Sequence, residues 1–211
     1  VGSRGLGDVY KRQNMSAIFF EEMIIPRPAY NLEVNSMSHG AMTGQMIEKI
    51  EKVLEIEQPD ALIVYGDTNS TIAGALTAKK MNIKVVHIEA GLRSYNMKMP
   101  EEINRIVTDR ISDLLSCPTE TAIDNLRKEG FDNLPILIER HGDIMKDAVR
   151  YYGQFSANKS SIIKDQKLEK NEFVLATIHR QENTEDTEKL IAIFTALEEI
   201  HKIQPVVLPL H

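Results

Sequence analysis

The sequence predicts an α/β fold built on parallel strands, and three observations support this fold class. Short β-branched runs alternate with helical patterns along most of the chain. Four of these runs end in an ionisable residue, namely Asp67, Glu89, His179 and His211. The 211 residues, 42% of them hydrophobic, suffice for the core of one large or two small domains. Because ligands bind outside the carboxyl ends of parallel strands, the four polar ends indicate a catalytic cleft.

The first half of the chain predicts a regular alternation of helices and strands. Residues 41–60 carry apolar side chains at the i, i+3, i+4, i+7 spacing of an amphipathic helix that ends near Gln58 and Pro59. Strands are expected at Ala61–Tyr65, Lys84–Ile88, Leu114–Cys117 and Ile136–Ile138. Helices are expected at 70–81, from Pro100 onward, at Thr119–Glu129 and at Ile144–Tyr152.

A polar stretch at 154–170 divides the chain into a first domain, 14–153, and a second domain, 171–211. In the second domain the pattern predicts a strand at Phe173–Ile178, a helix at Thr187–His201 and a strand at Val206–Leu210. Residues 1–13 have no periodicity and are interpreted as a non-native leader. The chain stops directly after the apolar run PVVLPL, so we expect it to be a fragment.

Composition excludes several classes of protein. The net charge of −6 argues against a nucleic-acid surface, which needs clustered Lys and Arg. No apolar stretch approaches the roughly 20 residues of a membrane span, and no signal peptide is evident, so a cytoplasmic protein without a membrane partner is expected. Cys117 is the single cysteine, which excludes an internal disulfide and a cysteine-rich metal site. Its apolar setting predicts a buried structural thiol.

The spacing of Asp67 and Glu89 is the strongest signal of a site. Their 22-residue separation fits one loop, helix, loop and strand, so a right-handed crossover brings both to the same edge of the sheet. Neighbouring strands lie about 4.8 Å apart, so both carboxylates would face one pocket, and like charges this close raise the pKa of at least one. The alternatives are that Asp67 caps the next helix and that Glu89 pairs with Arg93.

Other polar residues have both a functional and a structural interpretation. Glu101 could supply a third acid held by Arg105, or form a surface i, i+4 ion pair with it. The strand exit at His179 and Arg180 suits a phosphate or a pyrophosphate leaving group, although His179 could also be a core histidine. His87 lies inside a predicted strand and is interpreted as a core or supporting residue.

Four motifs together resemble one enzyme family. The segments VYGDTNST, HIEAGLRS, MPEEINRIVTD and TIHRQEN, in this order, are similar to those of the non-hydrolysing UDP-N-acetylglucosamine 2-epimerases, and NMSAIFFEE and IPRPAYNL extend the resemblance over residues 14–211. The resemblance implies a glycosyltransferase-B-like fold with two Rossmann-like domains, the second one truncated here, and an active site in the cleft between them. It implies interconversion of UDP-GlcNAc and UDP-ManNAc for cell-surface polysaccharides, without NAD or metal, through UDP elimination and a 2-acetamidoglucal. A full-length protein would be a homodimer.

The resemblance also implies roles for individual residues. It makes Asp67, Glu89 and Glu101 the catalytic carboxylates and His179 a catalytic histidine of the cleft. Substrate-binding residues are expected to be Arg93, Arg105, Arg180 and His211.

The family's opening strand and basic phosphate loop, and its later Ser-Gly-Gly segment and ribose-binding Glu, have no counterpart in residues 14–211. The chain by itself is therefore expected to be inactive. Three alternatives stay open: an epimerase of a UDP-2,3-diacetamido uronic acid, a hydrolysing enzyme that releases ManNAc, and a sugar-nucleotide binding module without turnover.

Overall fold

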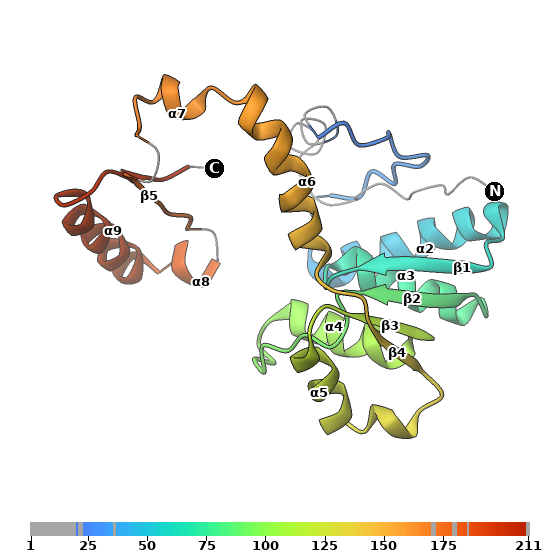
Figure 1. Cartoon of the computed structure of the whole chain (residues 1–211). Coiled ribbons are helices and arrows are strands. Elements are labelled where there is room, and N and C mark those ends of the chain that lie inside the picture. The colour runs from blue at the N-terminus through green and yellow to red at the C-terminus, as the bar shows by residue number, and fades with distance from the viewer. Residues whose placement is uncertain are drawn as a thin grey trace. The chain divides into compact units, whose positions relative to one another are not determined.

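The computed structural model describes residues 20, 23–35, 37–169, 172–178, 181–184 and 186–209, with the backbone alone at 157–158 and 181–182. The chain divides into two compact units, residues 1–150 and 151–211, and each is described by itself. Figure 1 shows the elements along the chain. Within the described part, no helix is long and apolar enough to cross a membrane.

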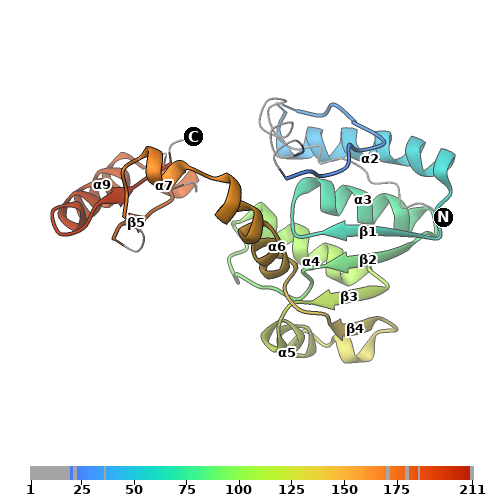
Figure 2. The ribbon, with the colours of Figure 1, turned by 45° about the horizontal axis from the view of Figure 1, so that its top comes forward.

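The first unit is built on a parallel four-stranded sheet. Its strands are β1 (Ala61–Tyr65), β2 (Lys84–Ile88), β3 (Leu114–Cys117) and β4 (Leu137–Arg140). They pair in the order β1-β2-β3-β4, so β1 and β4 are the two edges of the sheet as far as the chain is described (Figure 2). The predicted bounds of the first three strands are confirmed, whereas β4 starts and ends later than the predicted 136–138.

Four helices connect and cover the strands: α2 (His39–Glu57), α3 (Asn69–Lys80), α4 (Pro100–Ile111) and α5 (Glu120–Lys128). Helix α3 packs against β1 and β2 and contacts both α2 and α4, while α5 packs against β3 and β4. Proline stands at the first turn of α4, and the Thr119 hydroxyl accepts a hydrogen bond from the backbone of α5 at 3.2 Å. Both helix starts agree with the sequence prediction.

The core consists of two clusters of buried apolar residues. The first cluster combines residues of α2, α3 and β1. The residues that α2 contributes are Met42, Met46, Ile50, Val53 and Leu54. The second cluster lies around β3 and α5 and includes Leu115, Cys117 and Leu126. Cys117 is fully buried, and burial together with the charge of Asp109 raises the pKa of its thiol to about 12, so the prediction of a buried thiol is confirmed.

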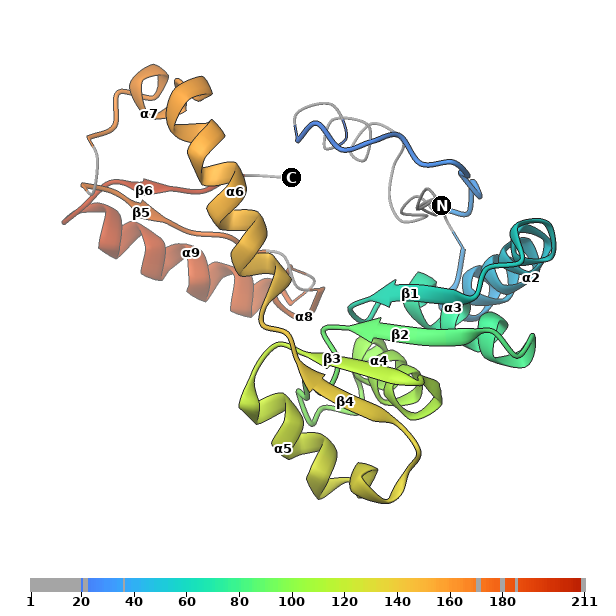
Figure 3. The same cartoon turned by 45° about the vertical axis from the view of Figure 1, so that its right-hand side comes forward.

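The second unit begins within a long helix, α6 (Ile144–Lys159), which is followed by α7 (Ile162–Asp165). The predicted linker 154–170 is therefore partly helical, and α6 continues past its predicted end at Tyr152. The remaining elements are β5 (Val174–Leu175), α8 (Gln181–Thr184), α9 (Thr187–His201) and β6 (Val206–Val207). Strands β5 and β6 are parallel and α9 runs beside them (Figure 3).

Candidate functional site

The turns that follow β1 and β2 lie side by side. Tyr65 is in register with Ile88, and the Gly66 amide donates a hydrogen bond to the Ile88 carbonyl at 3.0 Å. One carboxylate oxygen of Glu89 lies 3.4 Å from the position that a Cβ on Gly66 would occupy. The structure thus brings Glu89 against the turn that carries Asp67, as the 22-residue spacing predicts.

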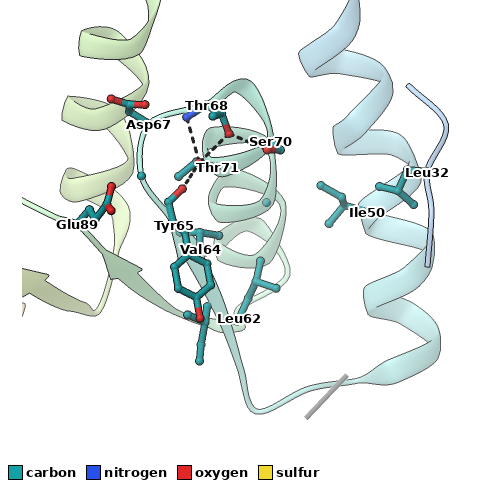
Figure 4. Close-up of a pocket in the computed structure, with 13 residues that line it drawn as sticks. Leu32, Ile50, Leu62, Val64, Tyr65, Asp67, Thr68, Ser70, Thr71 and Glu89 are labelled. Atoms are coloured by element: carbon teal, nitrogen blue, oxygen red, sulfur yellow. Dashed lines mark hydrogen bonds between the residues drawn. The ribbon is translucent and has the colours of Figure 1, made fainter. Parts of the chain in front are cut away.

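Asp67 and Glu89 both line a pocket of about 490 Å³. Its polar side is formed by the start of α3 and the two carboxylates. Its apolar side is formed by β1, by Ile50 of α2 and by Leu32, which precedes α2 (Figure 4). In Figure 4 the two carboxylates stand on the side of the turn that faces away from Leu32 and Ile50. A pocket with one apolar wall and a few convergent polar groups is typical of a small-molecule site.

The backbone at Glu89 is held in an unfavourable conformation. Its φ is +70°, a left-handed value that costs a residue with a side chain roughly 1–2 kcal/mol. Gly66 across the gap also has a positive φ, +63°, which glycine adopts freely. Such strain at a non-glycine residue is typical of functional sites, because the surrounding structure must hold the residue there.

Asp67 does not cap the helix that follows it. Thr68 is the N-cap of α3, and the Thr68 amide donates to the Thr71 hydroxyl, which in turn donates to the Tyr65 carbonyl at 2.6 Å. The Asp67 carboxylate instead forms an ion pair with Arg105 of α4. The interpretation of Asp67 as a helix cap is therefore wrong, and its carboxylate is available to the pocket.

Arg105 joins Asp67 to a second carboxylate, Glu102. Glu102 is almost fully buried, and it accepts hydrogen bonds from the Ser94 amide at 2.9 Å, the Ser94 hydroxyl at 3.0 Å and the Tyr95 amide at 2.9 Å. Burial alone would raise the pKa of Glu102, but these bonds and the charge of Arg105 lower it. Through Glu102, Arg105 thus links the loop after β2 to Asp67. The sequence predicts a substrate contact for Arg105 but not this link.

Glu101, the third predicted acid, does not share the pocket of the other two. It is exposed at the first turn of α4 and is not part of the pocket wall around Asp67 and Glu89. Among the residues that the structure describes, its carboxylate accepts no hydrogen bond, and Arg105 pairs with Asp67 and Glu102 instead. The alternative of a Glu101–Arg105 surface pair is wrong, and the catalytic role of Glu101 stays a prediction.

Arg93 also has partners other than the predicted one. Its guanidinium, 1% exposed, pairs with Asp109 at 2.7 Å and with Glu129 at 2.7 and 2.8 Å. Burial disfavours the charged form, yet the bonds to Glu129 and Asp109 raise the pKa of Arg93. The predicted alternative of a Glu89–Arg93 pair is wrong. Arg93 is not among the residues that line the pocket, and its contact with substrate stays a prediction.

Glu89, by contrast, is half-buried and has no cation bonded to it within the described residues. Its pKa is raised, and burial is the largest cause. The charges of Asp143 and Asp67 also raise the pKa, whereas those of His87 and Arg105 lower it. Sequence reasoning missed Asp143, which follows the end of β4 just as Glu89 follows β2. The signal that could have identified it is the same: an acid placed after a parallel strand.

The raised pKa gives a stability prediction for Glu89→Gln. A carboxyl whose folded pKa exceeds the unfolded one contributes stability below the unfolded value of 4.5 and loses that contribution as the pH rises through the folded value. At neutral pH the amide should therefore be more stable than the parent chain, and the difference should shrink below pH 4.5. Urea unfolding across this range is the measurement.

Glu48→Gln is the matched control. The exposed Glu48 is bonded to Lys52, which lowers its pKa, so the amide should not stabilise the chain at neutral pH. Equal stability of Glu89→Gln and the parent at every pH would contradict the raised pKa assigned to Glu89.

Three of the predicted site residues, His179, Arg180 and His211, lie outside the described residues. Their expected roles stay predictions.

Comparison with known proteins identifies relatives of this chain. Residues 10–211 match the family model described as UDP-N-acetylglucosamine 2-epimerase. The chain is 50% identical over 199 residues to the UDP-2,3-diacetamido-2,3-dideoxy-D-glucuronate 2-epimerase of Pseudomonas aeruginosa, covering 94% of this chain and 55% of that protein. It is 45% identical over 203 residues to the UDP-N-acetylglucosamine 2-epimerase of Methanococcus maripaludis, again covering 94% and 55%.

A solved structure gives the same result. The Methanocaldococcus jannaschii UDP-GlcNAc 2-epimerase in complex with UDP-GlcNAc and UDP matches with a TM-score of 0.82 and 41% identity, over 92% of this chain and 54% of that one. The chain thus spans about half the length of the relatives it matches. The predicted α/β, glycosyltransferase-B-like fold class is confirmed by this similarity. On the family match over residues 10–211, the chain belongs to the UDP-N-acetylglucosamine 2-epimerase family.

Proposed function

We propose that the protein containing this chain inverts C2 of a UDP-linked 2-acetamido sugar and interconverts UDP-GlcNAc and UDP-ManNAc. The observation that carries the proposal is the pair of unlike carboxyls at one pocket. Asp67 is ion-paired with Arg105, whereas Glu89 has no cation bonded to it among the described residues and has a raised pKa. Two carboxyls whose surroundings differ in this way suit acid and base roles at one reacting centre.

In the proposed reaction a base removes the C2 proton while the bond from C1 to the UDP oxygen breaks, and UDP leaves with the electron pair. The product is a 2-acetamidoglucal with a double bond between C1 and C2. Return of UDP to C1 and delivery of a proton to the opposite face of C2 give the epimer, so protons and electrons balance without an external oxidant. The C2 proton is weakly acidic, which is why a positioned carboxylate is needed to remove it.

Asp67, which is paired with Arg105, suits proton removal, and Glu89, whose pKa is raised, suits proton delivery; in the reverse direction the roles exchange. Glu101 and His179 complete the proposed catalytic set, with His179 at the leaving pyrophosphate. Arg180 and His211 are proposed to lie near the nucleotide. The resemblance to relatives supports these roles, and the proposed site needs parts beyond the 211 residues, so the chain alone is expected to show no turnover.

A second substrate is favoured by one observation. Identity to the Pseudomonas aeruginosa protein, whose name gives a UDP-2,3-diacetamido glucuronate as its substrate, is 50%, against 45% to the Methanococcus maripaludis UDP-GlcNAc epimerase. Both substrates carry the acetamido group at C2 and share the same proposed elimination. Groups at C3 and C6 would distinguish them.

The test is an assay of both sugars with a protein that extends this chain to the length of its relatives. We expect the C2 epimer of one sugar to accumulate until equilibrium is reached, and solvent deuterium to enter C2. Proton NMR of the anomeric signals measures the conversion. Release of free ManNAc would replace the proposal with hydrolysis. Binding of both sugars in a calorimeter without conversion of either would contradict the epimerase and favour a binding module.

A further inference from the structure

His87 is a fully buried histidine with a hydrogen-bond acceptor on each ring nitrogen. It lies in β2, two residues before Glu89, and its side chain is 0% exposed. Its Nδ1 is 2.7 Å from a carboxylate oxygen of Asp109 on α4, and its Nε2 is 2.7 Å from the carbonyl oxygen of Gly66. The mechanism proposed above does not use this side chain.

The two partners fix the protons on the ring. A backbone carbonyl only accepts, so Nε2 must carry a hydrogen. The other oxygen of Asp109 accepts from the Arg93 guanidinium at 2.7 Å and from the Gly91 amide at 3.1 Å, and this pairing with a guanidinium favours the carboxylate form, which only accepts. Nδ1 must then carry a hydrogen as well. A neutral imidazole has one N–H, so the ring with two is the imidazolium.

The charges around His87 agree with this conclusion. Arg93 is paired with two carboxylates, Asp109 and Glu129, so these three groups together carry one net negative charge. A protonated His87 makes this group of four neutral, with Glu129 at its solvent-exposed end. Because an uncompensated charge inside a protein is costly, the neutral arrangement is favoured.

The other ionisable groups around the ring do not oppose this state. Glu89 at the end of β2 and Asp67 on the neighbouring turn are acids, and the buried Cys117 on β3 keeps its proton because its pKa is raised to about 12. His87 and Arg93 are thus the cations on this side of the sheet that contact Asp109.

We propose that His87 is a positioning residue that acts as an imidazolium and ties together the two turns that carry the paired acids. On one side it holds Gly66, the residue before Asp67. On the other side it holds Asp109, which fixes Gly91, two residues after Glu89. The catalytic meaning of this link rests on the proposed function, whereas the protonation state does not.

The first test measures the ring itself. Long-range proton–nitrogen correlation spectra of the 211-residue chain, labelled with ¹⁵N-histidine, report whether each ring nitrogen carries a hydrogen. At about pH 8, where a histidine in water is neutral because it titrates near about 6.5, both nitrogens of His87 should still show the protonated shift. His201, whose Nδ1 accepts a hydrogen bond from the Val206 amide at 2.9 Å, is the internal control and should show a bare Nδ1. One protonated and one bare nitrogen at His87 would overturn the proposal.

A variant gives an independent check on the charge argument. Asp109→Asn keeps the shape of the side chain and removes its charge, so the histidine should lose its second proton and show a neutral pattern at the same pH. An unchanged imidazolium pattern in a folded Asp109→Asn protein would overturn the assignment of Asp109 as the stabilising partner.

The last test concerns positioning in the extended protein. His87→Gln can donate to only one of the two acceptors, so kcat should fall by about 10²-fold, the cost of a small misplacement of reacting groups, with KM within a few-fold. An unchanged kcat would reject the positioning role even if the spectra show the imidazolium. If no sugar is turned over by the parent protein, the proposed function fails while the spectroscopic result stands by itself.

Discussion

Glu89→Gln, made in a protein that extends this chain to the length of its relatives, should lower kcat by about 10²–10⁴-fold, the range that a general acid or base supplies. At about 1.4 kcal/mol per decade, this is roughly 3–6 kcal/mol of barrier. The amide keeps the size of the carboxyl beside Gly66 but can neither accept nor deliver a proton as the carboxyl does. Binding of the UDP-sugar should change little, because the loss concerns proton transfer.

The decisive measurement is solvent deuterium at C2 of the product. The parent protein should incorporate it, and Glu89→Gln and Asp67→Asn should nearly abolish it. Glu48→Gln is the control, because that carboxylate is exposed on α2 and pairs with Lys52. Normal incorporation in both amide variants would remove Asp67 and Glu89 from the proton-transfer role and leave them as structural residues.

Gly91→Ala should have the largest effect on stability. Gly91 has a φ of +77°, and a Cβ added there would lie 2.5 Å from the carbonyl oxygen of Ala122 and 2.9 Å from its carbon. The left-handed conformation costs a residue with a side chain roughly 1–2 kcal/mol, and overpacking costs about 1–3 kcal/mol, so the free energy of unfolding should fall by about 2–5 kcal/mol. Urea unfolding followed by circular dichroism measures this loss.

Gly44→Ala provides a matched control. Gly44 lies inside α2, and a Cβ at this position would meet no atom within 4 Å. Alanine is the better helix former by about 0.5–1 kcal/mol, so this variant should be slightly more stable than the parent. Equal stability of Gly91→Ala and the parent would show that the turn after β2 can move away from α5, and that the contact with Ala122 does not constrain it.

Much of the first unit could be predicted from local patterns. β1, β2 and β3 are β-branched runs bounded by clear turn signals, and α4 starts at a proline followed by two acids. The end of α6 could not be predicted, because residues 154–159 have no clear apolar period and no proline or glycine stops the helix there. β5 and β6 are shorter than the strands predicted from their apolar runs. A strand is defined by pairing with its neighbour, and only two residues of each strand pair with the other.

The site was predictable where it depends on topology and not where it depends on packing. A crossover of fixed length brings Asp67 and Glu89 together, so their spacing sufficed. The partners of the two arginines were predicted from nearness in sequence, four residues away, whereas Arg93 pairs with Asp109 and Glu129, 16 and 36 residues away. No local pattern encodes which buried carboxylate a helix turns toward a given guanidinium.

The edge position of β1 bears on how the chain behaves at high concentration. Within the described part of the chain β1 pairs on one side only, with β2, and its side chains Ile63 and Tyr65 are 52% and 55% exposed. An unpaired strand edge with apolar side chains is a template for a strand from another molecule. We therefore expect association through this edge to compete with the monomer as the protein concentration rises.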